Sequence, residues 1–211
     1  MGRQGAAADP PPSPPAPVWQ DWVPGVTYLP DNRWDARIPP TVLQRLRPKP
    51  TATDAAAARS SKVRAGRITD PAHPACGELG LFAARRLPAG EHLCDYRGVV
   101  TLAEHEDTSS AYTVAFIEEG ELRLTLDAAR AGSEGRFAND YHGVPVRVPL
   151  GRQAPKARAN ACFKTYMDAR GNTRLGIFAE AALGKGDEVL LSYGRGFWRA
   201  RTSHGAEETI S

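Results

Sequence analysis

The chain has 211 residues, of which 41% are hydrophobic and 24% are charged, and its formal net charge is +3. This length suits one ordinary domain with additional segments better than two full domains. No stretch of 18 apolar residues occurs, so we expect no membrane-spanning helix, and the first residues suggest neither a secretory signal nor myristoylation. The mild positive charge is compatible with acidic partners, although many ordinary enzymes carry as much.

Proline and large aromatic residues mark the N-terminal part. Most of the 18 prolines lie in the first 50 residues, and they are densest over residues 10–17. Because proline removes amide donors and restricts the backbone, we predict a disordered Pro-rich tail over residues 1–17. We assign residues 18–65 to an N-terminal segment that ends in a linker over residues 48–65. Its large aromatic anchors are Trp19, Trp22, Tyr28 and Trp34. These rings either dock on the following domain, which we favour, or form a peptide-like ligand for a partner.

The pattern of apolar and polar residues changes at residue 66. From there to residue 199, short apolar runs alternate with glycine and charged turns, which is typical of a mostly β domain. The strand candidates are residues 79–83, 91–101, 112–117, 122–126, 161–167 and 187–193. Turns of hairpins are expected at residues 118–121 and 169–172, and the helical signal is limited to short pieces such as residues 128–137. We therefore predict one domain over residues 66–199 and a C-terminal tail over residues 200–211.

An internal repeat lies within this domain. Residues 79–83 read Leu-Gly-Leu-Phe-Ala and residues 175–179 read Leu-Gly-Ile-Phe-Ala, and the similarity continues to residues 93 and 189. Two copies are too few for a solenoid, so the repeat indicates two similar strand–turn–strand units. Gly90 and Gly186 occupy the same position in the two copies, where we expect a turn that requires a positive φ.

Three segments contain residues that could carry chemistry. Residues 76–83 read Cys-Gly-Glu-Leu-Gly-Leu-Phe-Ala, and a glycine in such a loop lets backbone groups approach a ligand closely. Residues 127–140 read Asp-Ala-Ala-Arg-Ala-Gly-Ser-Glu-Gly-Arg-Phe-Ala-Asn-Asp, and residues 186–194 read Gly-Asp-Glu-Val-Leu-Leu-Ser-Tyr-Gly. In this order and spacing, the segments resemble the SET domain of protein lysine methyltransferases over about residues 66–199.

The resemblance implies a mostly β SET fold of several small sheets, with short helices and a pseudo-knotted C-terminal segment. It also implies S-adenosylmethionine as the cofactor. The matching cofactor-binding positions are Glu78, Leu79, Gly80, Arg136, Phe137, Asn139, Asp140, Tyr193 and Trp198. Two of these depart from the family's pattern, since Glu78 replaces the first glycine of the loop and Asp140 replaces the usual histidine. Arg136 also suits a structural role in which it pairs with a carboxylate or with carbonyl oxygens.

Tyr193 matches the catalytic tyrosine of the family, which would position the amine and the cofactor. An unperturbed lysine has a pKa of about 10.4, so the site must favour the neutral amine by desolvation and by the nearby sulfonium charge. The positions that match the lysine channel are Tyr96, Tyr112, Phe163, Leu191 and Phe197. Because Phe163 and Leu191 offer no hydroxyl to hold a water molecule, we expect products beyond monomethyl-lysine.

Two features lie outside the pattern. Many members of the family carry a cysteine-rich zinc segment after the tyrosine, but this chain has only three cysteines, widely spaced, and no metal is expected. An insertion over residues 143–158 contains no acidic residue. Its basic residues are Arg147, Arg152, Lys156 and Arg158. This loop either contacts an acidic substrate or nucleic acid, or it is a solvated loop with no ligand.

The function implied by the resemblance is methyl transfer from S-adenosylmethionine to a lysine side chain of another protein, either a histone tail or a non-histone protein. The altered glycine loop, Asp140 and the basic insertion favour an alternative, a catalytically silent SET fold that binds a protein or a nucleic acid. The residues do not distinguish a nuclear from a cytoplasmic location.

Overall fold

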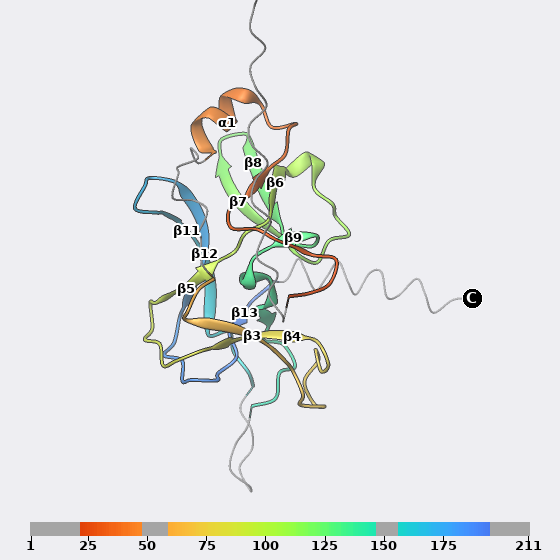
Figure 1. The fold of residues 1–211 in the computed structure, drawn as a ribbon, viewed down its shortest axis with the longest axis vertical. Helices are drawn as coiled ribbons and strands as arrows, with labels where there is room; N and C mark the ends of the chain where they lie inside the picture. Colours follow the sequence, from red (N-terminus) through yellow and green to blue (C-terminus); the bar gives the residue numbers. More distant parts are fainter. Residues whose placement is uncertain (1–21, 48–58, 147–155, 195–211) are drawn as a thin grey trace, which may run out of the picture.

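Short strands dominate the fold. The computed structural model describes residues 22–47, 59–146 and 156–194. Within these ranges the chain forms several small sheets with one α-helix and two 3₁₀ helices (Figure 1). The predicted mostly β architecture of small sheets and short helices is confirmed. The predicted tails, most of the linker and Trp19 lie outside the described residues.

The elements are arranged in five sheets or strand pairs. In chain order they are β1 (Thr27–Tyr28), β2 (Arg33–Trp34), α1 (Pro40–Leu46), β3 (Val63–Arg67), β4 (Leu79–Ala83), β5 (His92–Asp95), β6 (Val99–Leu102), η2 (Ala103–His105), β7 (Thr113–Glu119), β8 (Leu122–Asp127), β9 (Ala131–Gly132), η3 (Glu134–Phe137), β10 (Asn139–Asp140), β11 (Ala161–Met167), β12 (Thr173–Ala179) and β13 (Leu190–Leu191). The two larger sheets have the strand orders β2–β6–β8–β7 and β11–β12–β5, and the pairs are β1–β9, β3–β4 and β10–β13.

Both predicted hairpins are present. β7 and β8 pair in antiparallel fashion around Gly120, and β11 and β12 do so around Gly171. Each glycine has a positive φ, 59° and 78° respectively, which a glycine adopts without the steric cost that a Cβ would add. The short apolar runs therefore identified these strands, and the glycine and charged residues identified their turns.

The internal repeat corresponds to two structural units that face each other. Leu87 and Leu183 form a β-bridge in which each backbone N–H donates to the other's carbonyl oxygen at 2.9 Å. Gly90 and Gly186 have φ values of 83° and 89°, as we predicted for their shared turn position. The repeat is thus a feature of the fold that holds the two strand–turn–strand units together.

The prediction of a helical piece over residues 128–137 is wrong for its first part. Ala131 and Gly132 form β9, and only η3 is helical. The reason is tertiary pairing, because β9 lies parallel to β1 of the N-terminal segment, and a weak helical preference yields to such contacts. The predicted strand 91–101 is also divided, since β5 and β6 are separated by residues 96–98.

The N-terminal segment docks on the domain, as we favoured from its aromatic residues. β1 pairs with β9, and β2 extends the largest sheet by pairing in parallel with β6. Trp22 packs edge-on against Tyr28 with ring centroids 5.1 Å apart, and Trp34 packs against Phe116 at 6.4 Å. Figure 1 shows this segment, in red and orange, running beside β6 and β9. The predicted linker also contributes, because β3 begins at Val63.

The C-terminal part of the described chain returns to the middle of the sequence. β13 pairs in parallel with β10, so that Asn139 lies opposite Leu190 and Asp140 opposite Leu191. This is the pairing expected of the pseudo-knotted C-terminal segment. Asn160 ties the same strand to β11, since its side chain donates to the carbonyl oxygen of Glu188 and accepts the N–H of Leu190, both at 2.8 Å.

The described helices are all too short or too polar to cross a membrane. Cys76, Cys94 and Cys162 are free thiols that are exposed, buried and half-buried respectively. No group of three or more His, Cys, Asp or Glu side chains in the described ranges could hold a metal ion.

Gly98, which directly precedes β6, lies closely against the end of β8. A Cβ at this position would collide with the carbonyl oxygen of Asp127 and lie 2.5 Å from a methyl group of Leu126. We predict that Gly98→Ala lowers the free energy of unfolding by about 2 kcal/mol or more, as overpacking does. Chemical denaturation followed by circular dichroism measures the change. Gly184→Ala is the matched control, because its Cβ would meet only the flexible carboxylate of Asp187 at 3.3 Å, and a drop of equal size there would contradict the interpretation.

Candidate functional site

Two cavities lie on either side of a shared wall. Cavity A has a volume of about 810 Å³ and lies between the N-terminal segment, the β3–β4 pair and η3–β10. Cavity B has a volume of about 730 Å³ and lies against β7 and the loop that precedes it. Both volumes are in the range of small-molecule sites. The residues that line both cavities are Ala111, Tyr112, Arg136 and Tyr193.

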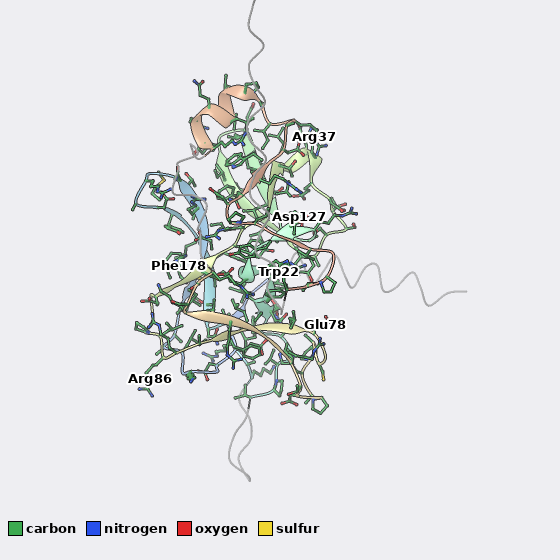
Figure 2. The ribbon with its side chains drawn as sticks, viewed as in Figure 1. Trp22, Arg37, Glu78, Arg86, Asp127 and Phe178 are labelled. Atoms are coloured by element: carbon green, nitrogen blue, oxygen red, sulfur yellow. The ribbon has the colours of Figure 1, made fainter. Side chains whose placement is uncertain are left out.

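Most of the predicted cofactor-binding residues meet at cavity A. Its lining includes Glu78, Leu79, Arg136, Phe137, Asn139 and Tyr193. Gly80 and Asp140 lie next to this lining but do not belong to it. Trp198 lies outside the described residues. The cavity is also lined by residues that we did not predict, among them Trp22 and Val23 of the N-terminal segment and Arg67 of β3. Figure 2 labels Trp22 and Glu78, which reach this cavity from distant parts of the sequence.

The predicted lysine-channel residues meet in part at cavity B. Tyr96, Tyr112 and Phe163 line it, whereas Leu191 is fully buried in the core and lines neither cavity. Phe197 lies outside the described residues. The loop over residues 106–111 also lines cavity B. No sequence pattern identified it, because only the folded chain brings it to the same cavity as Tyr96 and Phe163.

The aromatic side chains of cavity B hold one another in place. The Tyr96 hydroxyl donates to the carbonyl oxygen of Tyr112 at 2.7 Å, and the ring of Tyr96 meets the edge of Phe163 at a centroid distance of 5.2 Å. Burial raises the pKa of the Tyr96 phenol well above its ordinary value, and the nearby Tyr193 adds to this shift. The phenol of Tyr96 therefore stays in its neutral form at the wall of cavity B.

Arg136 forms part of the wall between the cavities, and its guanidinium group makes its contacts with other parts of the fold. Its guanidinium donates to the carbonyl oxygens of Ala128 and Ala129, at 2.9 Å and 3.3 Å. The same group lies over the ring of Tyr112, 4.4 Å from the ring centroid, in a cation–π contact. These contacts fit the structural role that we considered for Arg136, and they fix the position of Tyr112 at the junction.

Tyr193 follows β13, and both its hydroxyl and its backbone N–H are hydrogen-bonded. Its hydroxyl donates to the carbonyl oxygen of Ala138 at 2.7 Å, and its backbone N–H donates to Asp140 Oδ2 at 2.6 Å. Ala138 and Asp140 flank Asn139 of β10, so the pairing of β10 with β13 places the phenol at the junction of the two cavities. The position that departs from the family's pattern, Asp140, thus anchors the predicted catalytic tyrosine.

Asp140 is buried, and its carboxylate accepts two backbone N–H groups. The second comes from His142 at 2.8 Å, and the His142 ring also contacts the carboxylate. Burial by itself would raise the pKa of Asp140, but the N–H groups of Tyr193 and His142 outweigh it and hold the pKa below its ordinary value. The carboxylate is therefore ionised near neutral pH and stabilises the turn that carries Tyr193.

The basic insertion lies apart from the two cavities where it can be described. Lys156 and Arg158 are exposed and line neither cavity, and Arg147 and Arg152 lie outside the described residues. Contact with nucleic acid remains a prediction.

Asp140→Asn tests the anchoring of Tyr193. The amide keeps the shape of the carboxylate but offers one oxygen, so one of the two backbone N–H groups loses its acceptor. We predict a loss of about 1–3 kcal/mol in the free energy of unfolding at pH 7. Because the folded-state pKa of Asp140 is depressed, its stabilisation is present above the unfolded value of about 3.9 and is lost as the pH falls through the folded pKa. The difference in the free energy of unfolding between wild type and Asp140→Asn should therefore become smaller in acid.

Denaturation curves at several pH values measure this difference. Asp107→Asn is the control, because Asp107 also accepts a backbone N–H, from Ser109, but is exposed. A gap between wild type and Asp140→Asn that stayed constant down to pH 2 would contradict the assignment.

The SET domain family model matches residues 78–194, which are more than half of the chain. The histone-lysine N-methyltransferase MEDEA of Arabidopsis thaliana is 28% identical to it over 134 residues, which make up 61% of this chain and 17% of MEDEA.

Solved structures of ctPRC2 are also similar. One is in an autoinhibited conformation bound to S-adenosylmethionine, and its match covers 72% of this chain and 18% of that chain. An apo form with mutations in Ezh2 covers 70% and 17%. Both matches have 20% sequence identity and a TM-score of 0.45. The chain therefore spans less than a fifth of each of these relatives.

Proposed function

Because the chain belongs to the SET-domain family, we propose that it transfers a methyl group from S-adenosylmethionine to a lysine side chain of another protein. The observation that carries the proposal is the meeting of two cavities at Tyr112, Arg136 and Tyr193. Methyl transfer requires two ligands to approach the same point from different sides, and a shared wall with a phenol in it meets that requirement.

The lining of cavity A fits S-adenosylmethionine in its chemistry. Trp22 and Phe137 supply aromatic surface suited to a purine base. Glu78 supplies a carboxylate suited to an ammonium group, and Asn139 supplies a hydrogen-bonding amide. When bound, S-adenosylmethionine supplies an electrophilic methyl group on a positively charged sulfur. The replacement of a glycine by Glu78 is compatible with such a cationic ligand.

The chain's own residues would prepare the lysine. Tyr96, Tyr112 and Phe163 surround part of cavity B with aromatic surface, and desolvation there disfavours an ammonium ion, which lowers the pKa of an entering lysine. The neutral amine is the nucleophile, so this environment increases its population. Tyr193 would position the amine at the junction, where its phenol is already directed by the carbonyl oxygen of Ala138.

The substrate is a protein that presents a lysine, and a histone tail in chromatin is one candidate class. The name of MEDEA states histone-lysine methylation for that protein, and the loop at cavity B contributes Glu106 and Asp107, which suit a positively charged peptide.

Tyr193→Phe tests the catalytic assignment. Removing the hydroxyl leaves the ring to fill the junction but deletes the polar group there, so we expect methyl transfer to fall by about 100-fold or more. Incorporation of labelled methyl groups into protein measures the rate. Tyr141→Phe is the matched control, because Tyr141 lines neither cavity, and its variant should keep the wild-type rate. Full activity in Tyr193→Phe would refute the role of Tyr193.

The degree of methylation tests the channel assignment. Phe163 lines cavity B without a hydroxyl, so we expect dimethyl- and trimethyl-lysine to form when the cofactor is in excess. Mass spectrometry of the product distinguishes the three states. Accumulation of monomethyl-lysine alone would reject the prediction.

The alternative function is a catalytically silent SET fold that binds a protein or nucleic acid, which the sequence suggested because Glu78 and Asp140 depart from the family's pattern. It predicts that S-adenosylmethionine does not bind, whereas methyl transfer requires that it does. Isothermal titration calorimetry separates the two functions without knowledge of the substrate.

A further inference from the structure

We propose that Glu188 and His73 are positioning residues that fix the side-chain amide of Asn139 at cavity A. The inference rests on the proposed function, because Asn139 would contact the cofactor there. Asn139 Nδ2 donates to Glu188 Oε1 at 3.0 Å and approaches the carbonyl oxygen of Leu79 at 3.4 Å. Neither Glu188 nor His73 lines cavity A or B, and His73 lies outside the region that matches the family.

The contact with Glu188 decides which way the amide of Asn139 points. A carboxylate only accepts hydrogen bonds, so the atom facing it must be the NH₂ group. In the described part of the chain no donor reaches Asn139 Oδ1. Asn139 therefore offers an acceptor to a ligand in cavity A, and the ligand atom that meets it must be an N–H or O–H donor.

His73 holds the other oxygen of the same carboxylate. Its Nδ1 accepts the backbone N–H of Ala75 at 3.0 Å, so the ring proton resides on Nε2 and is donated to Glu188 Oε2 at 3.1 Å. The side chains of His73 and Glu188 are 5% and 13% exposed, so water competes little for these contacts. Each oxygen of Glu188 thus has its own donor, and the carboxylate has little freedom to rotate.

The backbone places this carboxylate close to β4. Glu188 forms a β-bridge with Phe82, and Asn160 binds its carbonyl oxygen. A Cβ at Gly80 would lie 2.9 Å from Glu188 Oε1. The glycine at position 80 therefore leaves the space through which Glu188 reaches Asn139.

Glu188→Gln is the first variant that tests the proposal, with calorimetric titration of the full chain by S-adenosylmethionine. A glutamine has one oxygen and one NH₂ group, so it cannot accept from both His73 and Asn139, and either the amide of Asn139 turns over or a donor faces a donor. We expect affinity to fall by about tenfold or more. Glu121→Gln, an exposed residue of the β7–β8 hairpin, is the control for loss of charge and should bind as wild type does.

Two substitutions of His73 separate positioning from local structure. His73→Gln keeps an N–H donor for Glu188 and loses the acceptor for Ala75, whereas His73→Asn keeps that acceptor and loses the donor. If His73 acts through Glu188, His73→Gln retains more affinity for S-adenosylmethionine than His73→Asn. The reverse order would show that His73 only stabilises the loop around Ala75, and would overturn its part in the proposal.

A third readout needs no cofactor. The NH₂ resonances of Asn139, identified by their loss in Asn139→Ala, should shift in the NMR spectrum of Glu188→Gln and stay unchanged in Glu121→Gln. If wild type does not bind S-adenosylmethionine, the proposed function fails, and the NMR shifts still decide the positioning of Asn139. If wild type and Glu188→Gln bind equally and the Asn139 resonances do not move, the positioning role is overturned while the proposed function stands.

Discussion

The parallel pairing of β10 with β13 is the constraint on which the site depends. These strands are only two residues long, yet they bring residues 139–140 beside residues 190–191, which are distant in sequence. The carboxylate of Asp140 then accepts the backbone N–H of Tyr193, and the carbonyl oxygen of Ala138 accepts a hydrogen bond from the Tyr193 hydroxyl. One short contact therefore sets both the place and the direction of the phenol, and the rest of the candidate site is organised around it.

The surrounding fold supports this contact from three directions. The two strand–turn–strand units bridge each other at Leu87 and Leu183. Asn160 ties the strand before Tyr193 to β11 through two hydrogen bonds. The N-terminal segment adds β1 beside β9 and places Trp22 in the wall of cavity A. Segments on both sides of the chain thus converge on a junction where two ligands would meet, which is the geometry that group transfer between them requires.

Much of this could be predicted from the sequence, because its local signals agree with the fold. Short apolar runs and the turns between them identified the β7–β8 and β11–β12 hairpins, and the repeated pattern identified equivalent turns at Gly90 and Gly186. Family motifs selected residues that line the cavities, such as Asn139 and Tyr112. These features depend on neighbouring residues or on a pattern of fixed spacing, and both are visible in a single sequence.

Other features depended on contacts between distant segments, and no local pattern reveals these. Residues 131–132 joined a strand because β1 lies beside them. Leu191 was predicted at the channel, but its pairing with Asp140 turns it into the core. The partners of Asn139 come from a loop at residue 73 and from a strand end at residue 188. Only the folded chain brings these residues together.

In the proposed function, one cavity serves a methyl donor and the other serves a protein lysine. The most direct test is incubation of the full chain with a cell lysate and S-adenosylmethionine that carries an isotopically labelled methyl group, followed by mass spectrometry of the digested proteins. We expect labelled methyl groups on lysine side chains of one or a few proteins, and their absence when Tyr193 is replaced by phenylalanine. A lysate without labelled lysine, or with equal labelling by both forms, would contradict it.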